Sequence, residues 1–138
     1  MMNISARCEY ACRAMVELAL HQPEGDILTA QAIAASRHVP EKYLVHILLQ
    51  LKRAGLVHSV RGAQGGYALA LSPDQVSLLQ IVEAIDGPVL SPLPVDDSQG
   101  EEIKSVWGRV ADEIGAVLRS ISLRQMVEWS GRGQMYYI

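Results

Sequence analysis

Basic side chains gather in one stretch of the sequence, where they could bind a polyanion. Between Arg37 and Arg61 there are five basic residues and one acidic residue, a net charge of +4. The remaining residues include seven basic and fourteen acidic ones, so the whole chain carries −3. A polyanion would be attracted to the basic stretch and repelled by the rest, which gives orientation as well as affinity.

A helix predicted over residues 40–54 carries three candidate DNA-contacting side chains. Lys42 and His46 offer hydrogen bonds to bases or phosphates, and Val45 offers contact with a thymine methyl group. Tyr43 is expected to pack against the core. The buried face of this helix is expected to consist of residues spaced three and four apart, namely Leu44, Ile47, Leu48 and Leu51.

Two short strands predicted at residues 56–60 and 67–71 enclose a glycine-rich turn that begins at Arg61. Glycines permit the positive φ angles that the tip of a hairpin needs. An arginine on a thin hairpin can enter the minor groove, which attracts it most strongly where A·T tracts narrow the groove. The other candidate DNA-contacting residues of the hairpin are Ser59, Gln64 and Tyr67.

The chain lacks the residue patterns of an enzyme or a metal centre. It contains no nucleophile–base pair, no metal-ligand spacing and no phosphate-binding glycine loop before a helix. The glycines at 62–66 lie between predicted strands, so they indicate a hairpin and not a nucleotide-binding loop. We therefore expect no catalytic residues and no metal ligands.

Cys8 and Cys12 lie four residues apart in a helix predicted from residue 5 to residue 20. This spacing places both thiols on one face and works against a disulfide between them. One hypothesis is that both pack in the core as small hydrophobic residues. The alternative is a thiol-based redox sensor, in which Arg7 and Arg13 lower a thiol pKa and oxidation alters DNA affinity.

The order of the predicted elements is typical of a winged helix-turn-helix. A helix, a short helix, a tight turn, the basic helix and the hairpin follow one another, and a further helix closes the unit. The fold class is therefore mainly α with a small β-hairpin. The expected boundaries are 1–87 for the DNA-binding domain, 88–101 for a proline-rich acidic loop and 102–138 for a dimerisation helix and C-terminal tail.

The long helix expected at residues 102–120 carries apolar residues at alternating spacings of four and three. This pattern indicates a seam between two helices packed at a small angle, and so a homodimer. Gly108 and Gly115 lie beside the seam, which suggests that another backbone approaches closely there. The predicted interface residues are Ile103, Trp107, Val110, Ile114, Val117 and Ile121.

Export and membrane insertion are not indicated by the sequence. Glu9, Arg13 and Glu17 interrupt the N-terminal apolar stretch, unlike the core of a signal peptide. No apolar run approaches the roughly 20 residues that span a bilayer. We therefore expect a cytoplasmic protein with no membrane partner.

Several segments resemble the Rrf2 family of bacterial transcriptional regulators. They are residues 3–11, 43–44, 51–57 and, most specifically, the Ser-Val-Arg-Gly-Ala-Gln-Gly-Gly-Tyr run at 59–67. The resemblance covers nearly the whole chain. It implies a repressor that binds a palindromic operator in double-stranded DNA as a homodimer.

Within that family, the later part of the chain looks most like the branch of cysteine-metabolism repressors. Residues 83–88, Trp107 and residues 135–138 carry this similarity, which implies a role in sulfur metabolism with a cysteine-biosynthesis enzyme or a small molecule as effector. Cluster-binding members hold iron with three cysteines after the fourth helix, whereas residues 86–104 here contain no Cys or His. We therefore expect no iron–sulfur cluster and no other cofactor.

A winged helix can also act as a protein-interaction module without binding DNA. The basic stretch and its arginine-bearing turn favour DNA, because a hairpin that docks on protein more often exposes apolar side chains. A sequence-specific DNA-binding regulator is therefore the preferred hypothesis.

Overall fold

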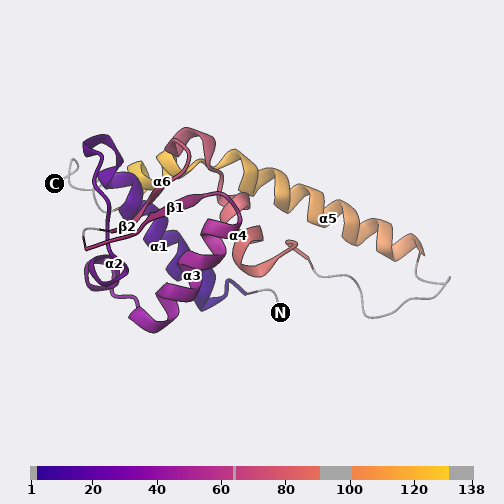
Figure 1. Cartoon of the computed structure of the whole chain (residues 1–138). Coiled ribbons are helices and arrows are strands. Elements are labelled where there is room, and N and C mark those ends of the chain that lie inside the picture. Colours follow the sequence, from indigo (N-terminus) through magenta and orange to yellow (C-terminus); the bar gives the residue numbers. More distant parts are fainter. Residues whose placement is uncertain (1–2, 64, 91–100, 131–138) are drawn as a thin grey trace.

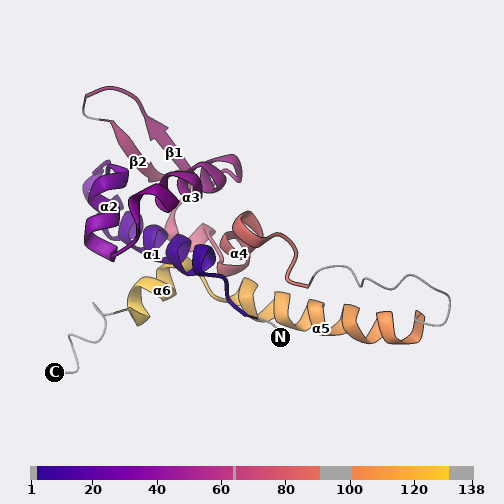
Figure 2. The same ribbon diagram turned by 90° about the horizontal axis from the view of Figure 1, so that it is seen from below.

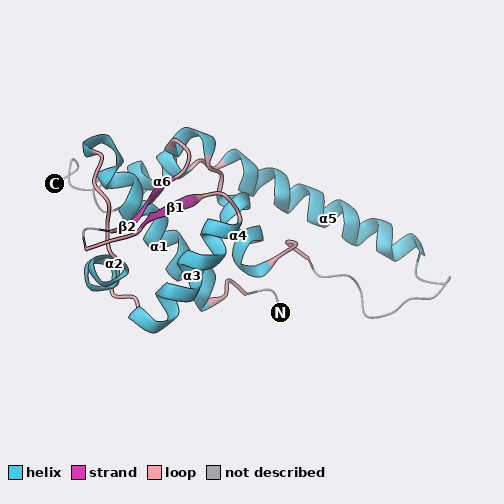
Figure 3. Cartoon of the chain, in the orientation of Figure 1, coloured by secondary structure: helices cyan, strands magenta, loops and turns pink. Residues whose placement is uncertain are grey.

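The computed structural model describes residues 3–63, 65–90 and 101–130, which form a mainly helical fold with one β-hairpin (Figures 1 and 3). The predicted fold class is confirmed. The helices and strands of the described residues are α1 (Ala6–His21), α2 (Ala30–Arg37), α3 (Glu41–Arg53), β1 (Val57–Val60), β2 (Gly66–Leu69), α4 (Leu78–Asp86), α5 (Glu101–Ser120) and α6 (Leu123–Trp129). Short 3-10 turns lie at Gln22–Glu24 and Pro73–Gln75.

Side-chain caps explain where most of these helices begin. Ser5, Thr29, Ser77 and Ser122 each have extended backbone, and each hydroxyl accepts a hydrogen bond from the backbone N–H three residues later. This bond satisfies one of the N–H groups that the first turn of a helix leaves without a partner. Each of these four helices therefore begins directly after a serine or threonine that caps it.

Helix α1 is the centre of the core, because α2, α3, α4 and α6 all pack against it. The inner face of α3 lies on α1, and the four residues predicted to be buried there, Leu44, Ile47, Leu48 and Leu51, are fully buried. Helix α6 reaches back to α1 from beyond the expected boundary of the DNA-binding unit, and its Leu123 is also fully buried. The core thus includes residues from both ends of the described chain.

The hairpin pairs β1 with β2 in an antiparallel register in which Ser59 faces Tyr67 and Val60 faces Gly66. Leu28, just before α2, pairs with the other edge of β2: its N–H donates to the carbonyl oxygen of Tyr67 at 2.9 Å, and the Tyr67 N–H donates back at 2.7 Å. A Cβ atom on Gly66 would lie 2.5 Å from the Leu28 carbonyl oxygen. Only glycine fits this close approach of two backbones, which holds the base of the hairpin on the body.

The C-terminal helices are joined to the winged helix by a second backbone link. The Leu78 N–H donates to the carbonyl oxygen of Ile121, and the Leu123 N–H donates to that of Val76, both at 2.8 Å. From this link α5 extends away from the body as a long helix, on the side opposite the hairpin (Figure 2). In the described part of the chain, no helix is long and apolar enough to cross a membrane.

The buried face of α3 should decide stability, and its outer face should not. We expect Leu44→Ala to lower the free energy of unfolding by about 2–5 kcal/mol, because it leaves a cavity at a fully buried site. Leu49→Ala is the matched control on the same helix, where the side chain is 41% exposed, and it should cost about 0.5 kcal/mol. Urea unfolding followed by circular dichroism measures both; equal losses would show that the faces of α3 are assigned wrongly.

Candidate nucleic-acid interface

The outer face of α3 is the first part of the candidate interface. Lys42, Val45 and His46 are all exposed there, on the side of the helix opposite its buried leucines. The expectation that Tyr43 packs in the core is wrong: its side chain is 47% exposed, and the Lys42 ammonium lies 5.2 Å from the centre of its ring. This cation–π contact holds the lysine near the first turn of α3. Tyr43 therefore belongs to the same surface as Lys42.

The turn between α2 and α3 sets the angle at which α3 is presented. His38 ends α2 in the left-handed conformation, with φ 55°, and its N–H donates to the Ala34 carbonyl oxygen. Val39 follows and is buried in the core, while Pro40 begins α3 without a side-chain cap. The reversal at His38 together with the anchor at Val39 fixes the start of α3 at the surface.

The hairpin is the second part of the candidate interface. Arg61 is exposed at the end of β1, and Gly62 next to it has φ 112°, a conformation that favours glycine. Ser59 and Tyr67 are partly exposed, and the Tyr67 side chain packs against the core. Gln64 lies outside the described residues. In Figure 2 the hairpin projects from the body beside α2 and α3.

A hydrogen bond joins the two parts of this surface. The ammonium of Lys52, at the end of α3, donates to the Ser59 hydroxyl on β1 at 2.8 Å. The sequence analysis did not pair Lys52 with the hairpin. On the opposite side of α3, the Arg7 guanidinium of α1 donates to the Gln50 side chain. These two contacts connect α3 to β1 and to α1.

One residue of the basic stretch is not available to a polyanion. The Arg37 Nε donates to Glu17 Oε1 at 2.8 Å, and the Glu17 side chain is mostly buried on α1. The Arg13 guanidinium in turn donates to the Arg37 carbonyl oxygen at 3.3 Å. The surface charge of the stretch therefore comes from the four basic residues that are exposed, Lys42, Lys52, Arg53 and Arg61.

The two cysteines are free thiols on the inner side of α1. Cys8 is buried, and a hydrogen bond from Cys12 lowers its pKa against the effect of burial. The same hydrogen bond, together with burial, raises the pKa of Cys12. The arginines expected to activate a thiol are engaged elsewhere, Arg7 with Gln50 and Arg13 with Glu9. These contacts favour packing over a redox role.

Mild peroxide should therefore leave both thiols of the folded protein unmodified. Cys12 is protonated at neutral pH because its pKa is raised, and Cys8 is 2% exposed, so neither presents an accessible thiolate. Mass spectrometry of the intact protein after peroxide treatment measures this, with protein unfolded in guanidinium chloride as the reactive control. A sulfenic acid or disulfide on the folded chain would reinstate the thiol-switch hypothesis.

An apolar stripe runs along α5. Ile103, Trp107 and Val117 are 57%, 43% and 60% exposed in the single chain. The remaining predicted interface residues, Val110, Ile114 and Ile121, are partly exposed. A Cβ atom at Gly108 or Gly115 would meet nothing within 4 Å, so no packing within the described chain calls for glycine at either position.

Comparison with known proteins identifies relatives over almost the full chain. The Rrf2 family model, described as "Iron-dependent Transcriptional regulator", matches residues 4–129. The HTH-type transcriptional regulator CymR of Bacillus subtilis (strain 168) is 34% identical, over 99% of this chain and 100% of its own. The HTH-type transcriptional regulator IscR of Aliivibrio salmonicida is 30% identical, over 91% of this chain and 77% of its own.

Solved structures agree with these relatives. The structure of CymR, the global cysteine regulator of B. subtilis, matches with a TM-score of 0.79 and 33% identity, covering 94% of this chain and 99% of that one. The structure of T. potens IscR matches with a TM-score of 0.74 and 38% identity, covering 98% of this chain and 96% of that one. The chain belongs to the Rrf2 family of transcriptional regulators.

Proposed function

We propose that this protein is a sequence-specific DNA-binding regulator that acts as a homodimer. One observation carries the proposal: α3 and the hairpin lie next to each other on one side of the molecule, and α5 lies on the other (Figure 2), while Lys42, His46 and Arg61 of these two elements are exposed. A duplex could therefore contact α3 and the hairpin together while α5 stays free for a second chain. A chain with a net charge of +4 between Arg37 and Arg61 and −7 over its other residues would also approach DNA in one orientation.

Helix α3 is the element suited to the major groove, which is about 12 Å wide and admits one helix. Its first turns offer Lys42 and His46 to base edges or phosphates and Val45 to a thymine methyl group. The pairing of Lys52 with Ser59 places an ammonium and a hydroxyl where the helix meets the hairpin. Such a pair suits a backbone phosphate, which positions the protein without reading sequence.

The hairpin is the element suited to the adjacent minor groove. Arg61 is exposed beside Gly62, which has no side chain to obstruct approach. Gln64 and Tyr67 are the further candidates on this hairpin. An arginine in a narrow minor groove reads groove width, so A·T-rich flanks of the operator are the expected preference.

The apolar stripe of α5 is the proposed dimer interface, formed by Ile103, Trp107, Val110, Ile114, Val117 and Ile121. Pairing of two α5 helices would cover side chains that the single chain leaves in water, each worth up to about 1.5–3 kcal/mol when fully buried. Gly108, which is exposed in the single chain, would allow the two backbones to approach, whereas Gly115 is already buried within the chain. A two-fold dimer would present two α3 helices related by symmetry, and such a pair would match a palindromic operator.

An iron–sulfur cluster does not fit the residues present. The sequence contains only two cysteines, and both lie on the inner side of α1 and contact each other. A cluster requires several thiolate or imidazole ligands around one centre, and residues 86–104 supply neither type. We propose a regulator that works without a cluster. The likeness to CymR makes control of sulfur or cysteine metabolism by repression the first candidate, with a cysteine-biosynthesis enzyme or a small molecule as effector.

Replacement of Arg61 by alanine should weaken operator binding about tenfold or more. It should also reduce the slope of log affinity against log salt concentration by roughly 1, because one phosphate contact is lost. Arg124→Ala is the control, because Arg124 is an exposed arginine on α6. Fluorescence anisotropy with operator DNA selected from genomic fragments, repeated at several salt concentrations, measures both effects. Unchanged affinity of the Arg61 variant would refute the role of the hairpin, and absence of any DNA binding would favour the protein-interaction module.

Introduction of a charge into the α5 stripe should separate the dimer. We expect Trp107→Asp to give a monomer, because a carboxylate in the seam would be buried without a partner. Arg109→Asp is the control, since it places the same carboxylate on the opposite face of α5. Light scattering after size-exclusion chromatography reports the mass of each variant. A dimeric Trp107→Asp protein would place the interface elsewhere.

A further inference from the structure

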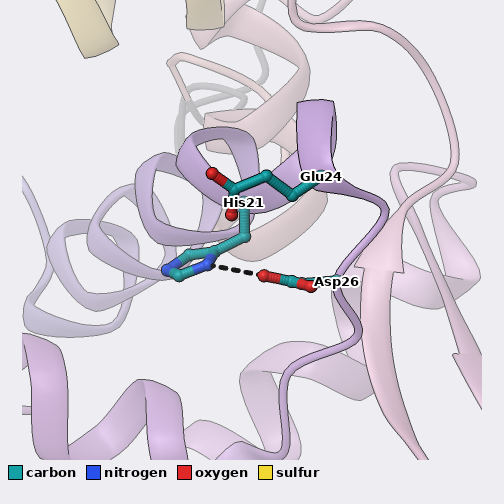
Figure 4. Close-up of side chains that lie close together, drawn as sticks. All are labelled: His21, Glu24 and Asp26. Atoms are coloured by element: carbon teal, nitrogen blue, oxygen red, sulfur yellow. Dashed lines mark hydrogen bonds and ion pairs between the residues drawn. The ribbon is translucent and has the colours of Figure 1, made fainter.

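We propose that His21, Glu24 and Asp26 form a binding site for a divalent transition-metal ion. His21 ends α1, Glu24 ends the 3-10 turn that follows, and Asp26 comes directly after Gly25, whose φ of 72° reverses the chain. Each residue offers one ligand atom, and these atoms all lie within 4.8 Å of one another. Figure 4 shows the His21 ring facing the Asp26 carboxylate while the Glu24 side chain extends back toward His21.

The donor set indicates the class of ion. One imidazole nitrogen with two carboxylate oxygens suits Zn²⁺, Mn²⁺, Fe²⁺ or Co²⁺, whereas Mg²⁺ and Ca²⁺ prefer ligands that are all oxygen. Ligands about 2.0–2.2 Å from such an ion lie roughly 3.0–3.5 Å from each other. His21 Nδ1 and Asp26 Oδ2 are already 3.3 Å apart, so these two groups could share an ion with little movement.

A second carboxylate orients the histidine ring from behind. His21 Nε2 lies 3.2 Å from Glu17 Oε2, and the other oxygen of Glu17 accepts a hydrogen bond from Arg37. A carboxylate behind a ligating imidazole fixes its tautomer, because the nitrogen that donates to the carboxylate leaves the other nitrogen with a free lone pair. With Nε2 donating to Glu17, a lone pair on Nδ1 would face the carboxylate of Asp26, and a cation between the two acceptors would satisfy both. Without an ion, a proton on Nδ1 makes the same 3.3 Å contact a hydrogen bond.

The site lies where an ion could influence the hairpin. Two residues after Asp26, Leu28 forms its paired hydrogen bonds with Tyr67 of β2. Gln22, between His21 and Glu24, donates from its side chain to the Leu71 carbonyl oxygen at 3.1 Å, just beyond β2. A bound ion would therefore tie the end of α1 to the segment that holds the base of the hairpin. Any resulting change in DNA affinity rests on the proposed function, whereas metal binding itself does not.

Titration of the tag-free full chain with Co²⁺, followed by visible absorption, tests the site directly. We expect one ion per chain in the wild type, loss of binding in His21→Gln and Asp26→Asn, and unchanged binding in His58→Gln, which removes an exposed histidine on β1. Zn²⁺ should raise the Tm of the wild type and not that of Asp26→Asn, because a ligand that binds only the folded state stabilises it. Circular dichroism without metal confirms that each variant is folded.

Several results would overturn the proposal. They are absence of Co²⁺ binding in the wild type, equal binding by Asp26→Asn, and the thiolate charge-transfer bands that would place the ion at the cysteines. Glu17→Gln should weaken Co²⁺ binding by about 10–100-fold if the carboxylate orients the ring, and an unchanged affinity would refute that role. If the ion binds but leaves DNA affinity unaltered, the link to the hairpin is wrong. If no DNA binds at all, the proposed function fails while the metal result stands.

Discussion

Burial of one face of α3 against α1 is the constraint on which the rest of the candidate interface depends. Leu44, Ile47, Leu48 and Leu51 have no exposure, so α3 cannot rotate about its axis without taking apolar area into water. This fixed rotation leaves Lys42, Val45 and His46 facing outward. The same packing also positions the hairpin, because β1 begins four residues after α3 ends. The packing of apolar side chains beneath α3 therefore decides which of its side chains are exposed in the candidate interface.

Polar contacts refine what the apolar core holds in place. Lys52 bonds to Ser59 and so connects α3 to β1, while Arg7 bonds to Gln50 and connects α3 to α1. Arg37 turns inward to Glu17, where the charge pair joins α2 to α1. Exposed ion pairs contribute little stability, but a mostly buried carboxylate such as Glu17 needs its partners to be tolerated. The network around Glu17 thus constrains the helix-turn-helix from inside.

The two sides of the molecule differ in their exposed side chains: one carries cations and the other an apolar stripe. The exposed cations of α3 and the hairpin lie away from α5, whose exposed side chains include Ile103, Trp107 and Val117. A charged surface attracts a polyanion over a distance, whereas an apolar stripe gains free energy only on contact. Both surfaces can therefore be occupied at once without competition. This separation accords with a regulator that pairs through one side and meets DNA with the other.

The sequence by itself determined the elements, because apolar periodicity is a local signal: the spacing of Leu44, Ile47, Leu48 and Leu51 predicted the buried face of α3. It also located the exposed arginine of the hairpin.

Only the tertiary structure decided which side chains meet across elements, since such pairings depend on how helices pack. The sequence could not show that Arg37 is taken up by Glu17 or that Tyr43 lies in solvent beside Lys42. Nor could it show the cluster of His21, Glu24 and Asp26, because a helix end and a reversal at Gly25 bring those ligands together, and no regular spacing encodes that turn.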